Sequence, residues 1–236
     1  MEKATFKSAD SNERVVAYLF LPDRQKFPPP WQAVVYWPSN VGYGLSSSQD
    51  GRNTLDISYW DYLVKGGRVV VYPIFKGVFE RGGREHVIHE PGMAGNRSAT
   101  KDVFRTLDYL ETRKDIRSDR IGLLALSVGV DGALMACAME RRIKAAVFIG
   151  GGFYGIPALD RDLAGFSRHI SMPVLMVNGR SDNFGQEFML GYFLTPPGQK
   201  RSQPFDGDHT LAGFEKDVKR VNLDWFDKYL GSVARK

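Results

Sequence analysis

Five short apolar runs recur along the chain, and segments with helical periodicity separate them. Four of the five are rich in valine and isoleucine and show little alternation between apolar and polar residues. Such runs are typical of strands that are buried on both faces of a parallel sheet. A repeated strand–helix order implies right-handed crossovers, so the sequence predicts an α/β fold with a mostly parallel central sheet and helices on both faces. The runs are residues 33–37, 68–72, 121–126, 145–149 and 173–178.

The segments around these runs complete the predicted fold. Residues 15–21 predict an antiparallel strand at the N-terminal edge of the sheet, and Pro204 and Phe205 predict part of a last short strand. The prolines at 28–30 predict a turn that leads into the strand at 33–37. Apolar residues at helical spacing predict four helices, at residues 54–65, 98–113, 128–140 and 211–230.

The chain has no repeat, low-complexity tract or long linker, so residues 1–236 are expected to form a single domain. Residues 77–97 carry several glycines and separate a predicted strand from a predicted helix. A loop of this length is often functional, and we expect it to act as a lid or an active-site loop. His86 and His89 within it have no third partner at a spacing typical of metal ligands, so neither a metal nor a cofactor is expected.

Composition excludes several classes of protein. With 43% hydrophobic residues, the chain is too apolar to be disordered as a whole. Its longest nearly unbroken apolar stretch, residues 121–130, is far shorter than the roughly 18 residues of a membrane-spanning helix. Residues 1–14 are polar and do not resemble a signal peptide. The single cysteine, Cys137, fits a reducing compartment, so a cytoplasmic location is expected.

The net charge of +5 could indicate an anionic partner, but the basic residues are scattered along the chain. Solvated helix faces explain such a distribution. We therefore expect neither nucleic acid nor a membrane as a partner, while a homo-oligomer remains compatible with the sequence.

Ser127 lies at a predicted strand-to-helix corner. The run at 121–126 ends at Leu126, and a helix of small residues follows Gly129. A tight turn of this kind lifts a serine hydroxyl clear of the sheet and directs the N–H groups of the following helix toward an oxyanion. It needs small residues two positions before and after the serine, as in G-x-S-x-G. Here Ala125 replaces the first glycine and Gly129 provides the second.

A nucleophilic serine needs a base and a group that orients the base. In folds with this corner the chain order is serine, acid, histidine. His169 precedes the strand at 173–178 and lies at the wrong end of the sheet, whereas His209 follows the last strand. Asp182 lies in a turn just beyond the carboxyl end of the strand at 173–178. We therefore predict Ser127, His209 and Asp182 as nucleophile, base and orienting acid.

The remaining site predictions concern binding. One oxyanion donor is expected to be the backbone N–H of Val128, and the other an amide of the loop after residue 37, with Asn40 or a neighbour as the candidate. Ser39 and Val41 of the same loop are predicted to contact the substrate. Phe188 belongs to an apolar set after Asp182, where core packing is the default and a wall of an acyl pocket is the alternative.

With these segments placed, the chain resembles the α/β-hydrolase family over about residues 15–231. It is similar to the esterase branch related to dienelactone hydrolases and prolyl-oligopeptidase-like peptidases, including esterase domains fused to bacterial protein kinases. The resemblance implies a serine hydrolase with a Ser-His-Asp triad that acts on a small carboxylic ester through an acyl-enzyme. Val130 departs from the branch pattern, which often has a second glycine there. The matching segments are residues 33–38, 69–73, 107–113, 119–122, 145–152, 173–180 and the pair at 208–209.

Three other functions stay open. A hydrolase-fold protein that binds without catalysis is compatible with the substitutions around Ser127. A peptidase of the prolyl-oligopeptidase-like type would use the same triad. The glycines at 150–155 match G-x-G-x-x-G, but Pro157 follows soon after and no acidic residue stands about 20 positions later, so a tight strand exit beside the active site is favoured over a nucleotide site. Cys137, among apolar residues in the middle of a helix, is interpreted as packing.

Overall fold

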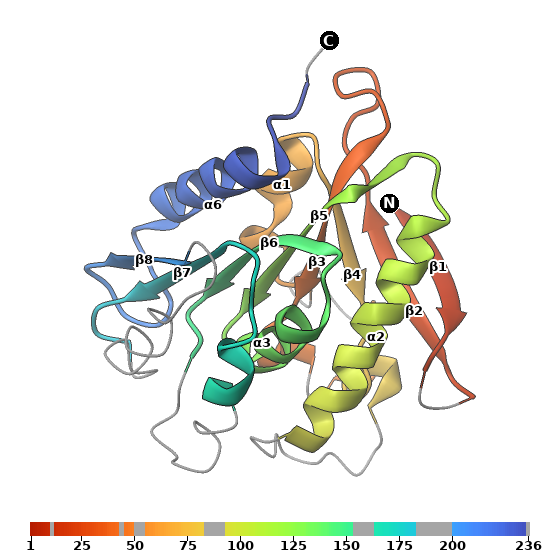
Figure 1. The fold of residues 1–236 in the computed structure, drawn as a ribbon, viewed down its shortest axis with the longest axis horizontal. Coiled ribbons are helices and arrows are strands. Elements are labelled where there is room, and N and C mark those ends of the chain that lie inside the picture. Colours follow the sequence, from red (N-terminus) through yellow and green to blue (C-terminus); the bar gives the residue numbers. More distant parts are fainter. Residues whose placement is uncertain are drawn as a thin grey trace.

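The structure, a computed structural model, describes residues 1–9, 12–42, 45–49, 55–82, 93–152, 163–182 and 200–234. Among these residues, eight strands form one sheet in the order β1-β2-β4-β3-β5-β6-β7-β8 (Figure 1). The strands β1 and β2 are antiparallel to their neighbours, and all the other pairs are parallel. The strands are β1 (Glu2–Lys7), β2 (Arg14–Phe20), β3 (Trp31–Trp37), β4 (Val69–Pro73), β5 (Ile116–Leu126), β6 (Ile143–Ile149), β7 (Val174–Gly179) and β8 (Lys200–Phe205).

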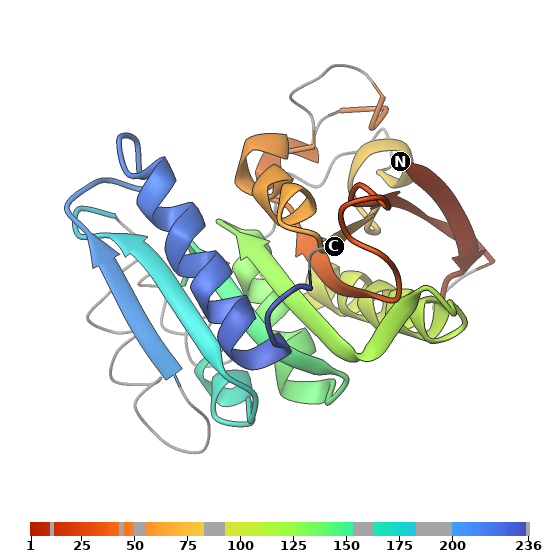
Figure 2. The ribbon, with the colours of Figure 1, turned by 90° about the horizontal axis from the view of Figure 1, so that it is seen from above.

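Helices cover both faces of this sheet, as predicted. Figure 2 shows α1 (Asp61–Lys65) and α6 (Glu215–Leu230) on one face and α2 (Met93–Glu111) and α3 (Gly129–Met139) on the other. The close contacts agree with this layering. Gly122 in β5 has no room for a side chain because the Phe226 ring of α6 lies against it, and the α3 residue Gly132 lies against the ring of Trp37. Three 3-10 turns complete the described elements: η1 (Asn40–Gly42), η2 (Ile57–Tyr59) and η3 (Phe79–Arg81).

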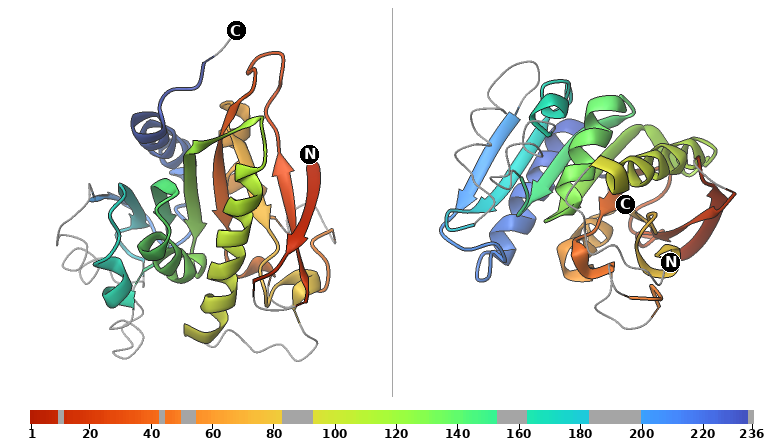
Figure 3. Two further views of the ribbon diagram at one scale, coloured as in Figure 1. Left: turned by 45° about the vertical axis from the view of Figure 1, so that its right-hand side comes forward. Right: turned by 90° about the horizontal axis from the view of Figure 1, so that it is seen from below.

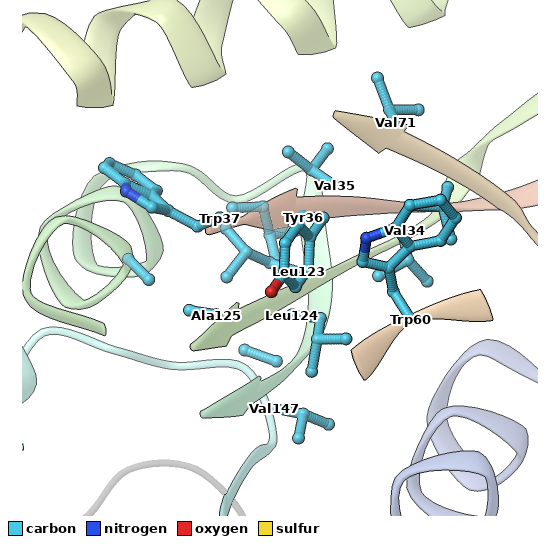
Figure 4. Packing of buried hydrophobic residues seen from close by; sticks show 14 of the residues in the cluster. Val34, Val35, Tyr36, Trp37, Trp60, Val71, Leu123, Leu124, Ala125 and Val147 are labelled. Atoms are coloured by element: carbon cyan, nitrogen blue, oxygen red, sulfur yellow. The ribbon is translucent and has the colours of Figure 1, made fainter. Parts of the chain in front are cut away.

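The core lies on both sides of the central parallel strands. Every residue of β3, β4 and β7 is buried, which explains the absence of polar alternation in their sequences. Neighbouring residues of β3 face opposite layers: Trp37 packs against α3 and stacks on Phe75, whereas Tyr36 points to the opposite face, where Trp60 precedes α1 (Figure 4). The loop that follows β3 therefore begins between two packed layers.

Several predicted boundaries were wrong. The strand predicted at 15–21 is antiparallel but is not at the edge, because β1 pairs with its outer side. Of the predicted helix 54–65, the described part forms only η2 and the short α1, and the last helix begins at Glu215 rather than residue 211. The last strand is longer than its predicted part, since β8 begins at Lys200.

The predicted loop at 77–97 is partly wrong. Residues 79–81 form η3, and α2 already begins at Met93, so both ends of the segment have regular structure. Residues 83–92 lie outside the described residues, and the lid remains a prediction.

The residues of the predicted site lie at one edge of the sheet. The strands from β3 to β8 run parallel, so their carboxyl ends lie together, and β1 and β8 occupy opposite ends of the sheet (Figure 3). Residues that follow β3, β5, β7 and β8 can meet at this edge, as is usual for binding sites in α/β sheets.

Candidate active site

Ser127 occupies the corner between β5 and α3. Its φ angle is 53°, a left-handed conformation that few residues other than glycine adopt. The corner is held by backbone hydrogen bonds: the Ser127 N–H donates to the carbonyl of Ile149 at 2.8 Å, and the Val130 N–H donates to the Ser127 carbonyl at 3.0 Å. Strained backbone of this kind persists only where the surroundings enforce it, and it is concentrated at functional sites.

Two glycines make room for this corner. A Cβ on Gly129 would lie 2.4 Å from the carbonyl oxygen of Pro38, and one on Gly151 would lie 2.5 Å from the carbonyl oxygen of Ser127. Ala125 and Val130, the departures from the family pattern, are fully buried. Val130 fills the space that Gly151 leaves, because a Cβ on Gly151 would also lie 2.4 Å from Cγ2 of Val130.

The structure brings Ser127, His209 and Asp182 together. The Ser127 Oγ lies 3.0 Å from Nε2 of His209, and Nδ1 of the same ring lies 3.1 Å from each carboxylate oxygen of Asp182. Asp182 follows β7 and donates its own N–H to the Gly179 carbonyl, while His209 lies in the loop between β8 and α6. Gly150 lets the ring approach, since a Cβ there would lie 3.3 Å from His209 Cε1.

The electrostatics of the histidine follow from these contacts. The Asp182 side chain is fully buried, whereas that of His209 is 38% exposed. The hydrogen bond to Asp182 raises the pKa of His209 above its ordinary value, against the opposing effect of burial. A carboxylate can only accept at Nδ1, so the neutral ring carries its proton there and presents Nε2 as an acceptor to the Ser127 hydroxyl.

Hydrogen bonds and a buried residue within the loop that carries His209 hold this loop in place. Oδ1 of Asp208 accepts hydrogen bonds from the N–H and the hydroxyl of Thr210, at 2.9 and 2.7 Å. Leu211 then adopts a left-handed conformation with φ 55° and is buried. A short polar turn followed by a buried anchor keeps the imidazole over the serine.

The candidate oxyanion donors can be compared by their hydrogen bonds. The N–H of Ser39 donates to Asp56 at 3.0 Å, and that of Val41 points to the Ser39 hydroxyl at 3.4 Å. The N–H groups of Asn40 and Val128 have no acceptor among the described residues. Asn40 is exposed and begins η1, where the first N–H groups have no partner within the turn. The arrangement leaves the amides predicted from the sequence available to a ligand.

No protein-family model and no curated protein matches the sequence. Solved structures do match. An acylaminoacyl peptidase from Pyrococcus horikoshii is 14% identical with a TM-score of 0.71, over 98% of this chain and 42% of its own. A protein from Klebsiella pneumoniae subsp. pneumoniae MGH 78578 that bears the name dienelactone hydrolase is 16% identical with a TM-score of 0.72, over 97% of this chain and 99% of its own. The chain has the α/β-hydrolase fold.

A third match widens the set of α/β-hydrolase neighbours. The 2,6-dihydroxy-pseudo-oxynicotine hydrolase is 18% identical with a TM-score of 0.72, over 100% of this chain and 70% of its own. These neighbours share the fold that the sequence predicts. At such identities the likeness concerns the fold, and this chain spans less than half of the peptidase.

A cavity of about 370 Å³ adjoins the histidine loop of this α/β-hydrolase fold. Thr210 and Leu211, directly after His209, form one wall, and Ile149, whose carbonyl accepts the Ser127 N–H, forms another. Tyr59 and Val218 also line the cavity, as do the charged Glu215 and Lys219, whereas the three triad residues do not. Apolar and aromatic walls with a few polar groups are typical of pockets for small molecules.

Two site residues have no signal in the sequence. Asp56 accepts hydrogen bonds from Ser39 and Tyr36, and Asn178, at the end of β7, donates from Nδ2 to the Gly151 carbonyl at 3.2 Å. Both are polar residues beside turns, which are common in any sequence, and only the fold brings them to the candidate site.

The structure tests some of the remaining sequence predictions, and the others fall outside the described residues. Phe188, His86 and His89 lie outside the described residues. Gly150, Gly151 and Gly152 follow β6 beside the triad, as expected of a strand exit, while residues 153–155 are not described. Cys137 is buried in α3, and burial raises the pKa of its thiol, consistent with packing.

The described part of the chain contains neither a cluster of metal ligands nor a membrane-spanning helix. There, no three histidine, cysteine or acidic side chains gather as a metal site would need. In those same segments, no helix combines the length and apolar character needed to span a bilayer.

Proposed function

We propose that this protein is a serine hydrolase that cleaves carboxylic esters through an acyl-enzyme. The observation that carries the proposal is the hydrogen-bonded chain from Ser127 through His209 to Asp182, with distances of 3.0 and 3.1 Å. A nucleophile, a base within hydrogen-bond reach and a buried acid that orients the base are the elements of acyl transfer by serine.

The first half of the reaction forms the acyl-enzyme. Nε2 of His209 takes the proton as Oγ of Ser127 attacks the ester carbonyl carbon. The carbonyl oxygen becomes an oxyanion, which accepts hydrogen bonds from the N–H groups of Val128 and Asn40. The carbon–oxygen bond to the alcohol then breaks, and the imidazolium returns its proton to the departing alkoxide. Asp182 stabilises the imidazolium throughout.

The second half repeats these steps with water. Nε2 of His209 removes a proton from a water molecule, which attacks the acyl carbon attached to Ser127. The bond to Oγ breaks, Oγ recovers the proton from His209, and the carboxylic acid leaves. The cycle consumes one water and needs no metal or organic cofactor.

The cavity beside the histidine loop supports a small ester as the substrate. Tyr59, Ile149, Leu211 and Val218 in its lining suit an apolar acyl or alcohol group of a few carbons, and Glu215 and Lys219 add a charged side to it. Dienelactone hydrolase, the name of one structural neighbour, denotes a hydrolase of a cyclic ester, and that neighbour matches over 99% of its length. A peptidase remains the second candidate because acylaminoacyl peptidase shares the fold.

Hydrolysis of p-nitrophenyl acetate, butyrate and octanoate by the wild type and Ser127→Ala tests the proposal. We expect turnover to fall by about 10³-fold or more in the variant. Ser171→Ala is the control, since Ser171 is exposed and lies before β7, away from the carboxyl edge. Retained hydrolysis by Ser127→Ala would contradict the assignment.

Two further measurements separate the alternatives. A fluorophosphonate should label wild-type Ser127, and the absence of an adduct favours a binding protein without catalysis. Faster hydrolysis of aminoacyl p-nitroanilides than of the esters favours a peptidase. A thermal shift with NAD or ATP would instead support a nucleotide site.

A further inference from the structure

Asp56 is bound to the end of β3 by side-chain hydrogen bonds. Its Oδ2 accepts the Ser39 N–H at 3.0 Å, and the Ser39 hydroxyl lies 3.0 and 3.2 Å from its two oxygens. The hydroxyl of Tyr36 donates to Oδ2 at 3.1 Å. Tyr36 points toward this side of the sheet, where Trp60 also lies (Figure 4). Two residues that flank the end of β3 thus converge on one carboxylate.

Asp56 has two features that are unfavourable to the stability of the fold. Its backbone is left-handed, with φ 50° and ψ 34°. Burial raises the pKa of its carboxyl group, although the hydrogen bonds from Ser39 and Tyr36 oppose this effect. Among the described residues, no lysine, arginine or histidine forms an ion pair with it. A half-buried carboxylate without a cation, on strained backbone, is not an arrangement that stability alone favours.

These contacts determine which loop amide stays available. The Ser39 N–H is taken by Asp56, and the Ser39 hydroxyl, fixed by the same carboxylate, faces the N–H of Val41. The N–H of Asn40 between them has no acceptor in the part of the chain that the structure describes. One carboxylate therefore organises three consecutive residues so that a single amide is left free.

The loop also lies directly beside the nucleophile. The carbonyl oxygen of Pro38, the residue before Ser39, approaches the first turn of α3 so closely that a Cβ on Gly129 would lie 2.4 Å from it. Gly129 is two residues after Ser127. A displacement of the loop at Ser39 would therefore be transmitted to the space above the serine, where an oxyanion forms.

We propose that Asp56 is a positioning residue for the oxyanion hole: by holding Ser39, it directs the Asn40 N–H toward the oxyanion that forms at Ser127. The proposal rests on the proposed serine hydrolase function. Among the described residues, Asp56 forms hydrogen bonds with Ser39 and Tyr36 and none with the triad. It therefore acts through the Asn40 N–H, which donates a hydrogen bond to the negatively charged oxygen in the transition state.

Asp56→Asn is the informative variant. It keeps the size of the side chain but removes the negative charge and leaves one acceptor oxygen. The three donors that now bind the carboxylate are the Ser39 N–H, the Ser39 hydroxyl and the Tyr36 hydroxyl, and an amide oxygen with two lone pairs cannot accept from all three. Loss of a whole oxyanion donor costs about 10²–10³-fold in kcat, so displacement of one should lower kcat by about 10- to 100-fold. KM should change by less than about threefold, because the donor acts mainly in the transition state.

The affinity for a phenylboronic acid measures the oxyanion hole directly, and a general structural defect would not change it in parallel with kcat. Its adduct with Ser127 places a negatively charged oxygen in the oxyanion hole, so its inhibition constant should rise in Asp56→Asn by about the same factor as kcat falls. Asp61→Asn is the control. It removes a carboxylate five residues further on, in α1, that pairs with Lys65 and lies near Lys219, and it should leave kcat and boronate binding unchanged.

The outcomes separate the two proposals. If the wild type hydrolyses no ester and takes up no fluorophosphonate, both fall. If the wild type is active in a Ser127-dependent manner, Asp56→Asn decides this inference alone. Unchanged kcat and boronate affinity would overturn it, as would a rise in KM alone or an equal loss in Asp61→Asn.

Discussion

The two sides of the candidate site are built by different forces. On the β5 side, Ser127 is held by backbone hydrogen bonds and by close packing, in which Gly129 and Gly151 leave no room for a Cβ. On the β3 side, the loop at Ser39 is held by the side-chain hydrogen bonds of Asp56. One side is enforced by sterics and the other by a single carboxylate.

This difference has a consequence for mutation. Protein interiors are close-packed, so residues on the β5 side have no space into which they can shift. Small substitutions there should cause large losses of activity and stability. Hydrogen bonds can be removed one at a time, so the β3 side should respond in steps.

The largest effect is expected from Asp182→Asn. The amide that replaces the carboxylate could donate to Nδ1 of His209, which would favour the wrong tautomer and place a proton on Nε2, facing Ser127. We expect kcat to fall by about 10³–10⁴-fold with little change in the melting temperature. Steady-state ester hydrolysis measures it. Asp206→Asn is the control, since Asp206 is exposed and, within the described residues, forms a surface ion pair with Arg180. A loss of less than tenfold in Asp182→Asn would contradict the assigned role.

Gly129→Ala tests the steric side directly. The new methyl group would lie 2.4 Å from the Pro38 carbonyl and 2.8 Å from the ring of Trp37, so the corner or the loop must shift. Overpacking of this kind costs about 1–3 kcal/mol of stability, and we expect kcat to fall by about 10- to 100-fold as the two oxyanion donors separate. Thermal unfolding and ester hydrolysis measure the two effects.

Gly165→Ala is the matched control, because no atom lies within 4 Å of its Cβ position. If Gly129→Ala behaves like this control, the β5 side is not sterically enforced.

The same difference explains what the sequence could predict. The corner at Ser127 and the parallel strands are encoded by neighbouring residues: small ones around the serine, and the apolar runs at 33–37 in β3 and 145–149 in β6. The sequence predicted both. The position of β1 was missed because its residues alternate between exposed and partly buried and include no run of large apolar residues. Asp56 was missed because its partners lie 17 and 20 residues away and meet it only after β3 has packed.

The choice among the loop amides was likewise beyond the sequence. It depends on which N–H groups the fold already engages, and that information arises from Asp56. By contrast, the order of Ser127, Asp182 and His209 could be placed at one edge, because each follows a strand whose direction the crossover rule determines. Their catalytic roles stay a prediction.

The pH dependence of activity should follow the protonation of His209 in the triad. The hydrogen bond to Asp182 raises the pKa of His209, and the base must be neutral to accept the Ser127 proton. Activity should therefore rise with pH through a pKa above the ordinary histidine value of about 6.5, and fall about tenfold for each pH unit below it. The pH profile of kcat/KM measures this. An acid limb centred at or below 6.5 would show that Asp182 does not stabilise the imidazolium.

The smallest effect is expected from Tyr36→Phe, which removes one donor from Asp56 and leaves both hydrogen bonds from Ser39 in place. Because a hydrogen bond to a charged group is lost inside the fold, stability should fall by about 1–3 kcal/mol. The loop is still held, so kcat should fall by no more than about threefold. Thermal unfolding and ester hydrolysis again measure the two effects.

Tyr72→Phe is the natural control for this last step. Tyr72 is buried beside Tyr36, with ring centroids 5.4 Å apart, and its hydroxyl has no hydrogen-bond partner within the described residues. Its removal should leave kcat unchanged and should not destabilise the fold, since a buried hydroxyl without a partner is itself costly. If Tyr36→Phe lowers kcat as far as Asp56→Asn does, the β3 side does not respond in steps, and its hydrogen bonds act as one indivisible unit, as the packed β5 side does.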